Sequence, residues 1–177
     1  ATPPAEARAL DCVEAGIDVA TPRRVIERAL RLSGDRLRIG DDEYDLTAYD
    51  RIVVLGGGNA AGHAAAAIER VLGDRIADGI VVTDNPVETD VVAVAAGGHP
   101  VPTEDGVEST RALLELAADV GPDDLVLAPV TGGGSALLAA PADPVRLADL
   151  QAVTEALLGA GATIHERSEE HTSELQS

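Results

Sequence analysis

Residues 51–72 read RIVVLGGGNAAGHAAAAIERVL and decide the fold, because they contain a strand, a glycine turn and a helix. The apolar, mostly β-branched run from Ile52 to Leu55 is typical of a strand buried on both faces of a parallel sheet. After three glycines, the alanine-rich segment from Ala60 to Val71 favours a helix that Asn59 would cap. The helix N-terminus would then face the glycine turn, where an anionic group binds best, although glycine at such a turn can also serve packing alone.

The rest of the chain repeats this alternation of buried strands and helices. Further strands are expected at 79–83, 91–95 and 124–130, and helices at about 105–118 and 145–159. This order predicts an α/β fold, a Rossmann-like three-layer domain with a mainly parallel sheet, which binds ligands at the carboxyl ends of its strands. A second glycine turn, residues 131–135, falls at the same edge.

The N-terminal segment predicts two helices and a hairpin. The first helix spans residues 4–19, with Cys12 as a buried small hydrophobe rather than a reactive thiol. The second is capped by Thr21 and runs to Gly34, with Val25 among its inward-facing residues. A short hairpin around residues 40–42 would lie at an edge of the sheet.

Composition restricts the partners of the protein. The 177 residues carry a net charge of −18, and all 13 basic residues are arginine, so that nucleic acid and anionic membranes would be repelled. An acidic, lysine-free surface is typical of halophilic proteins. The sequence shows no signal peptide and no apolar run of membrane-spanning length, which makes a cytoplasmic location the default expectation.

The first glycine turn matches a nucleotide-binding pattern. The segment from Gly56 to Ala61 fits the dinucleotide pattern G-x-G-x-x-A, and Asp84, which ends the next strand, could contact a ribose hydroxyl of NAD(P). A Walker P-loop is excluded because the chain has no lysine. No histidines or carboxylates have metal-ligand spacing, so any Mg²⁺ would arrive with a nucleotide.

The second glycine turn and one histidine complete the candidate site. Ser135 would cap the following short helix and offer its hydroxyl to a phosphate or a carboxylate. His99 lies in a glycine- and proline-rich loop at a strand end, where it could contact a ligand or hydrogen-bond to the backbone. His63, in the first turn of the alanine-rich helix, is expected to face solvent.

Four blocks of sequence carry a family resemblance. In the order VVLGGGNAAG, GGHPVP, APVTGGGSALLAAP and LLGAGATIHE, they resemble the N-terminal domain of the glycerate 2-kinase family, the MOFRL-type kinases often labelled hydroxypyruvate reductases. The resemblance implies an enzyme that uses ATP and Mg²⁺ to phosphorylate the C2 hydroxyl of glycerate, in a cleft between two domains. It also implies cofactor-binding residues Gly56, Gly57, Gly58, Asn59, Gly132, Gly133, Gly134 and Ser135, and substrate-binding residues His99 and Ser135.

The resemblance further implies a truncated chain. Residues 1–166 would be the N-terminal α/β domain, incomplete at its C-terminal end, and the C-terminal domain would be missing. Residues 167–177 read RSEEHTSELQS, which resembles a translated sequencing adapter and is treated as a non-native tail. Such a fragment is expected to be inactive alone, with glycerate as the small-molecule partner of the complete enzyme and a homodimer as one option.

One residue departs from the family pattern. The usual turn is G-x-G-K-A-A, and Asn59 stands where the lysine would be, so that this position cannot neutralise charge in phosphoryl transfer. An arginine of the missing domain could substitute, the subgroup could work differently, or this enzyme could be slow. The general base stays unassigned. The alternatives to a kinase are an NAD(P)-dependent hydroxypyruvate reductase and an anion- or sugar-phosphate-binding module without catalysis.

Overall fold

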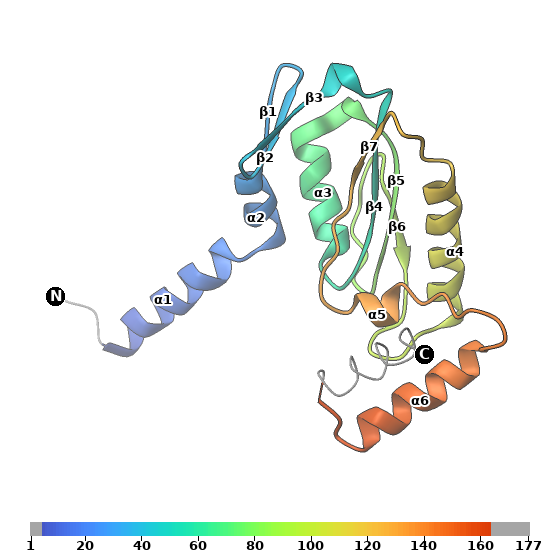
Figure 1. The fold of residues 1–177 in the computed structure, drawn as a ribbon. Coiled ribbons are helices and arrows are strands. Elements are labelled where there is room, and N and C mark those ends of the chain that lie inside the picture. The colour runs from blue at the N-terminus through green and yellow to red at the C-terminus, as the bar shows by residue number, and fades with distance from the viewer. Residues whose placement is uncertain (1–4, 164–177) are drawn as a thin grey trace.

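The computed structural model of the chain describes residues 5–163 (Figure 1). The predicted tail at 167–177 lies outside these residues and stays a prediction. The elements are α1 (Ala5–Val19), α2 (Pro22–Ala29), β1 (Leu30–Ser33), β2 (Arg36–Ile39), β3 (Asp42–Asp45), η1 (Leu46–Ala48), β4 (Arg51–Gly57), α3 (Ala61–Leu72), η2 (Gly73–Arg75), β5 (Ile76–Thr83), β6 (Ala93–Ala96), α4 (Glu104–Ala118), β7 (Asp124–Leu127), α5 (Gly134–Leu137) and α6 (Leu147–Gly159).

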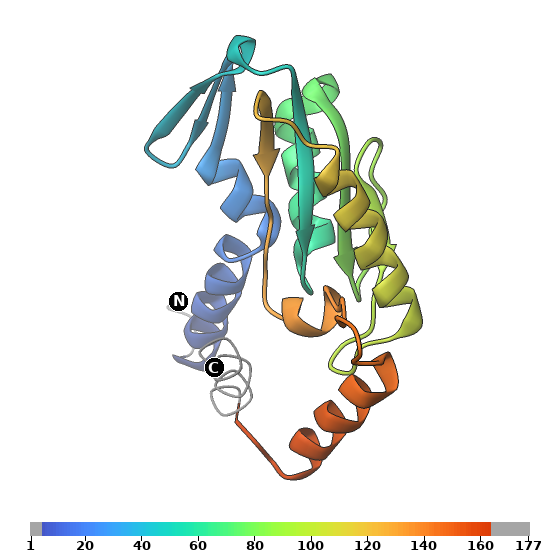
Figure 2. The same cartoon turned by 45° about the vertical axis from the view of Figure 1, so that its right-hand side comes forward.

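The main sheet has four parallel strands in the order β6-β5-β4-β7. Helix α3 covers one face and α4 the other, which confirms the predicted three-layer α/β architecture (Figures 1 and 2). The chain builds outward from β4 to β6 and then returns to place β7 on the other side of β4. The reversal of strand order between β4 and β7 is the position where open α/β sheets bind ligands.

The centre of this domain is β4 with its following helix, as predicted. Ile52, Val53 and Val54 are at most 4% exposed. Helix α3 presents small side chains to the sheet, and its buried residues are Ala61, Gly62, Ala64, Ala65, Ala67, Ile68 and Leu72. The strand continues through Gly57, so that the first two glycines belong to β4 and the turn is shorter than predicted.

The N-terminal region differs from the prediction in two ways. Helix α2 ends at Ala29 rather than at Gly34. The predicted hairpin around residues 40–42 is present as β2 and β3, but with β1 it forms a separate antiparallel sheet instead of lying at the edge of the main sheet. Leu30 is buried and Arg31 exposed, an alternation typical of a strand, and β1 pairs with β2 across the turn at Gly34, where φ is +60°.

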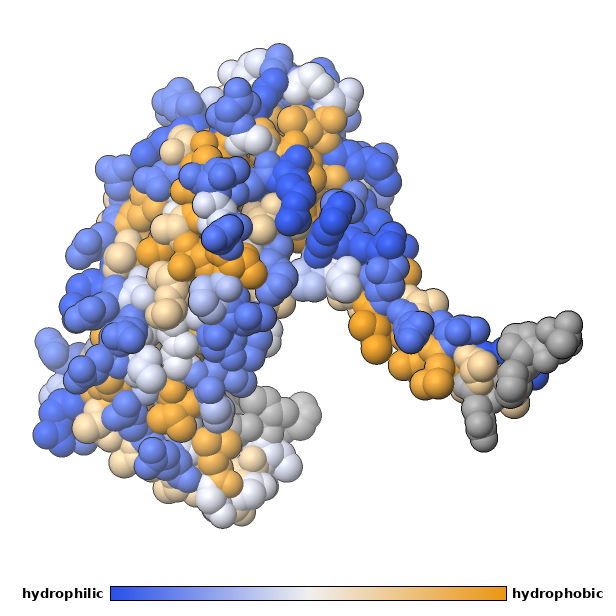
Figure 3. Space-filling view, turned by 180° about the vertical axis from the view of Figure 1, so that it is seen from behind, coloured by the Kyte–Doolittle hydropathy of each residue, from blue (hydrophilic) through white to orange (hydrophobic). Residues whose placement is uncertain are grey.

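Helix α1 extends away from the body of the domain (Figures 1 and 2). Its apolar residues Leu10, Val13 and Ile17 are 63%, 57% and 65% exposed, and Figure 3 shows apolar side chains along this projecting helix. Cys12 is exposed with them, so its predicted burial is wrong, because the apolar side of α1 has no domain surface against it among residues 5–163. Val25, on α2, is also exposed rather than inward-facing.

No helix between residues 5 and 163 has both the length and the apolar character needed to cross a membrane.

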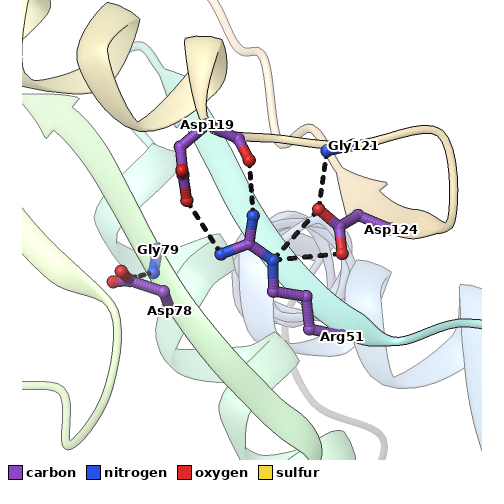
Figure 4. A network of polar contacts seen from close by, with 6 residues as sticks. All are labelled: Arg51, Asp78, Gly79, Asp119, Gly121 and Asp124. Atoms are coloured by element: carbon purple, nitrogen blue, oxygen red, sulfur yellow. Dashed lines mark hydrogen bonds and ion pairs between the residues drawn. The ribbon is translucent and has the colours of Figure 1, made fainter.

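A charged network fastens the N-terminal ends of β4 and β7 to the end of α4 (Figure 4). Nε of Arg51 lies 3.0 Å from both carboxylate oxygens of Asp124, and Nη2 donates to the backbone carbonyl of Asp119 at 2.6 Å. A hydrogen bond from the Gly121 N–H, together with Arg51, holds the pKa of Asp124 below its ordinary value. The network therefore fixes the end of the sheet opposite the glycine turns.

The carboxylate of Glu69 fastens the loop between β5 and β6 to α3. It accepts hydrogen bonds from the N–H groups of Asp90, Val91 and Val92 at 2.9, 2.9 and 2.6 Å. Burial acts to raise the pKa of Glu69, but these three hydrogen bonds outweigh it and hold the pKa below its ordinary value. One carboxylate thereby satisfies three consecutive N–H groups of this loop.

Replacing Glu69 with glutamine is expected to lower the free energy of unfolding by about 1–2 kcal/mol at pH 7, because a neutral amide accepts these hydrogen bonds more weakly. Since the pKa is depressed in the folded state, the carboxylate stabilises the protein above its ordinary pKa near 4.5, and this contribution is lost as the pH falls through the folded-state value. Urea unfolding of wild type and E69Q at several pH values between 7 and 3 measures the difference in their free energies of unfolding, which should become smaller as the pH falls. The matched control is E115Q on the exposed face of α4, and an equal loss in both variants would contradict the prediction.

Candidate functional site

The two glycine turns lie against each other at the carboxyl ends of β4 and β7. The N–H of Gly57 donates to Pro129 O at 3.2 Å, and the N–H of Thr131 donates back to Gly57 O at 3.0 Å. The N–H of Asn59 then donates to Gly132 O at 2.8 Å. The sheet pairing thus continues beyond β7 and places both turns at the point where the strand order reverses.

The N–H groups of the first turn are all used within the chain. Besides Gly57 and Asn59, Gly58 donates to Val82 O at 3.0 Å, Ala60 to Thr131 Oγ1 at 3.1 Å and Ala61 to Gly58 O at 3.0 Å. The predicted cradle of backbone donors at Gly56–Asn59 therefore has no free N–H from Gly57 onward. Within residues 5–163, the N–H groups left without an acceptor at the N-terminus of α3 are those of Gly62 and His63, which come after the glycine turn.

Gly56, Gly57 and Gly58 lie at the contact between the two turns, which we call the seam. A Cβ on Gly56 would overlap Pro129, one on Gly57 would lie 2.5 Å from the Leu138 side chain, and one on Gly58 would overlap Thr131. Gly58 also has a φ of +130°, a conformation that residues with a side chain rarely adopt. These glycines are required by close packing between two chain segments.

The second turn presents free donors. Among residues 5–163, the N–H groups of Gly132, Gly133, Gly134 and Ser135 donate no hydrogen bond. Gly133, with φ +85°, is the N-cap of α5, so the prediction that Ser135 caps this helix is wrong. Ser135 lies inside α5 and is exposed, and its hydroxyl has no partner in the described part of the chain. Four N–H groups and a hydroxyl are thus open to a ligand.

Asn59, Asp84 and His99 form a side-chain cluster above the seam. Nδ2 of Asn59 lies 3.1 Å from Asp84 Oδ2 and 3.2 Å from His99 Nδ1. The residue does not cap α3 as predicted, because Ala60 is the N-cap and the Asn59 side chain turns toward the end of β5 instead. His99 and Asp84 are 32% and 30% exposed, so a small molecule can reach the cluster.

The loop that carries His99 is held at both ends. The Gly97 N–H donates to Thr83 O at 2.9 Å, and Thr103 caps α4 by accepting from the Gly106 N–H at 3.3 Å. From α6, Gln151 Nε2 donates to Pro102 O at 2.8 Å. The histidine therefore sits on a fixed loop between β6 and α4, as the strand-end prediction requires.

The structure also places His63, Thr131 and the potential metal ligands. His63 is exposed on α3, as predicted. Thr131 was not singled out from the sequence, although its hydroxyl joins the two turns; its place directly after an apolar strand was the available signal. Within residues 5–163, no group of three His, Cys, Asp or Glu side chains is arranged to hold a metal ion.

Comparisons with known proteins agree with this architecture. A protein of Agrobacterium vitis, provisionally named a hydroxypyruvate reductase, is 43% identical over 118 residues, which cover 66% of this chain and 31% of that protein. The D-glycerate 2-kinase of Thermotoga maritima is 34% identical over 163 residues, 89% of this chain and 35% of that protein. A crystal structure of a Pyrococcus horikoshii OT3 protein superposes with a TM-score of 0.78 at 30% identity and covers 93% of this chain and 37% of that one.

These matches confirm the resemblance on which the kinase prediction depends, and they confirm the fold. The chain spans about a third of the length of the relatives that it matches. The profile of a family described as a domain of unknown function, DUF4147, matches residues 8–167. Because this match covers nearly all of the sequence, the chain belongs to the DUF4147 family.

Proposed function

We propose that the chain is the N-terminal part of an ATP-dependent kinase that phosphorylates the C2 hydroxyl of glycerate to give 2-phosphoglycerate. In this proposal, residues 1–166 form an α/β domain that is incomplete at its C-terminal end, and a second domain completes the cleft. The names of relatives such as the Thermotoga maritima D-glycerate 2-kinase support it. The fragment alone would be inactive, because phosphoryl transfer depends on positioning by both walls of a closed cleft.

The observation that carries the proposal is the row of free N–H groups from Gly132 to Ser135. Such donors fit a phosphate or a carboxylate, so this turn would hold an anionic group of ATP or of glycerate. The seam glycines Gly56–Gly58 and Asn59 would place that turn rather than donate to the ligand. ATP, when bound with Mg²⁺, supplies the phosphoryl group, and this chain would orient the acceptor molecule through His99 and Ser135.

The reductase alternative has less support. Dinucleotide binding at a G-x-G-x-x-A turn places the pyrophosphate on the N-terminal donors of the following helix. Here the N–H groups of Gly57–Ala61 all donate within the chain, which leaves Gly62 and His63 as the free donors at the N-terminus of α3, and Asp84 already accepts from Asn59. A binding module without catalysis fits the same free donors, so only turnover separates it from a kinase.

The test compares the protein encoded by the complete gene with the 177-residue chain. We expect the complete protein to form ADP and 2-phosphoglycerate only when ATP, Mg²⁺ and glycerate are all present, and the short chain to form neither. NAD(P)H oxidation with hydroxypyruvate would instead identify a reductase. Glycerate binding without ATP consumption would identify a binding module, and turnover by the short chain would contradict the incomplete cleft.

We further propose that the protein is adapted to high salt, because a net charge of −18 without lysine disfavours the compact state at low ionic strength. A cytoplasmic location and a homodimer remain predictions.

A further inference from the structure

The amide nitrogen of Asn59 lies between two acceptors. It is 3.1 Å from Asp84 Oδ2 and 3.2 Å from His99 Nδ1, whereas His99 Nδ1 and Asp84 Oδ2 are 3.8 Å apart, too far for a direct hydrogen bond. Each of the two hydrogens on this nitrogen can therefore meet one partner.

The chemistry of Asp84 decides which way the amide points. An ionised carboxylate only accepts hydrogen bonds, so the nitrogen of Asn59 must face Asp84 and the oxygen must face away. The oxygen lies on the side of Gly133, where it is the atom nearest to the place of a Cβ on that residue. With the amide fixed in this way, its second N–H is directed at His99 Nδ1, which must present a lone pair.

We propose that Asn59, oriented by Asp84, is a positioning residue that fixes neutral His99 in the tautomer with its proton on Nε2, so that the ring presents an N–H donor to an oxyanion ligand. This deepens the proposed function, on which the choice of ligand rests. The ring edge that carries Nε2 lies beside the second turn, since His99 Cδ2 is 3.1 Å from the place of a Cβ on Gly133. Nε2 has no partner among residues 5–163.

The consequence is that the His99 ring adds one more N–H donor to those of the second turn. The free N–H groups of Gly132–Ser135 and the Nε2–H of His99 all suit the oxygens of a phosphate or a carboxylate. In this tautomer Nε2 has no lone pair and cannot accept the proton of a substrate hydroxyl. His99 is therefore assigned to anion binding, and the general base of the reaction lies elsewhere.

The tautomer can be measured directly by long-range ¹H–¹⁵N NMR on the ¹⁵N-histidine-labelled 177-residue chain, above the titration range of histidine. His99 is assigned with an H99Q variant, and exposed His63 serves as the internal control. We expect a protonated Nε2 and an unprotonated Nδ1 for His99. A protonated Nδ1, or the averaged tautomers that an exposed histidine shows, would overturn the proposal.

An exchange of two side chains reverses the hydrogen bonding at constant charge and nearly constant shape. In the double variant N59D/D84N, the new carboxylate at 59 accepts from the amide at 84 and from Nδ1–H. We expect the His99 proton to move to Nδ1, with no change at His63. An unchanged tautomer in a variant that keeps the wild-type backbone spectrum would overturn the role of Asn59.

A titration with inorganic phosphate tests the ligand. We expect the Nε2 resonance of His99 to shift while that of His63 stays in place, and an unmoved Nε2 would overturn the oxyanion assignment. None of these readouts depends on ATP turnover. If the kinase assay fails but His99 shows the expected tautomer, only the proposed function is overturned. If the kinase assay succeeds but His99 shows another tautomer, only the inference about Asn59 and His99 is overturned.

Discussion

Replacing Gly133 with alanine is expected to lower kcat/KM for ATP-dependent glycerate phosphorylation by the complete protein by about 100-fold or more. The new Cβ would overlap the amide oxygen of Asn59 and lie 3.1 Å from the His99 ring, so that it displaces both side chains. Alanine also disfavours the φ of +85° that Gly133 adopts as the N-cap of α5. A change in this φ would rotate the neighbouring free N–H groups, so that they would no longer point toward the same ligand. Loss of one such preorganised donor costs about 100- to 1,000-fold in known enzymes.

The control for backbone strain is Gly73→Ala. Gly73 has a φ of +57° and no atom within 4 Å of its Cβ position, and it lies at the far end of α3 from the glycine turns. G73A is expected to lose some stability and to keep its activity. Steady-state kinetics and thermal unfolding of both variants separate a loss of activity from a loss of stability. Equal activity in G133A and wild type would remove the second turn from the site.

Replacing Gly58 with alanine is expected to destabilise the domain by about 4 kcal/mol. Two effects combine, since a side chain at φ +130° is strained by about 1–3 kcal/mol and the overlap with Thr131 adds about 1–3 kcal/mol. Urea unfolding of the 177-residue chain measures the loss. For a domain at the lower limit of ordinary stability, about 5 kcal/mol, about 1 kcal/mol would remain, and roughly 15% of the chain would be unfolded without denaturant.

Two further variants separate strain from overlap. Gly34→Ala, at φ +60° with open space around its Cβ position, carries strain alone and is expected to lose about 1 kcal/mol. In G58A/T131A the hydroxyl is gone, but the Thr131 carbonyl oxygen would still lie 2.6 Å from the new Cβ, so the rescue should be partial. If G58A were no less stable than G34A, the close packing of the two turns would be contradicted.

The sequence was most informative where one segment determines its own structure. The run at Ile52–Leu55 and the alanines of α3 predicted strand and helix correctly, because burial on both faces and helix propensity are local properties. Leu30–Ser33 was misread as helix, although its alternation of apolar and polar residues indicates a strand. The missed signal was the turn at Gly34, which allows this segment to pair with β2.

The site was harder to predict because its hydrogen bonds join segments that are distant in the sequence. Nothing near Asn59 indicates that the N–H groups around it are taken by Pro129, Thr131 and Gly132. Cap propensity favoured Asn59 as an N-cap, but Asp84 and His99 attract its side chain more strongly once β5 and β6 are in place. The edge of the sheet that carries the site was predictable. That the first turn uses its N–H groups within the chain, while the second leaves them free, was not.

The projection of α1 has a consequence for how the domain unfolds. A 15-residue helix whose apolar side is exposed is only marginally stable in water, so α1 would fray and reform many times while the sheet stays closed, although an ion pair from Asp18 to Arg24 joins its end to α2. Its amide hydrogens would exchange with solvent almost as fast as those of a free peptide, and those of β4 only through global opening. The chain would therefore show two levels of hydrogen-exchange protection, with the boundary between them near the start of α2.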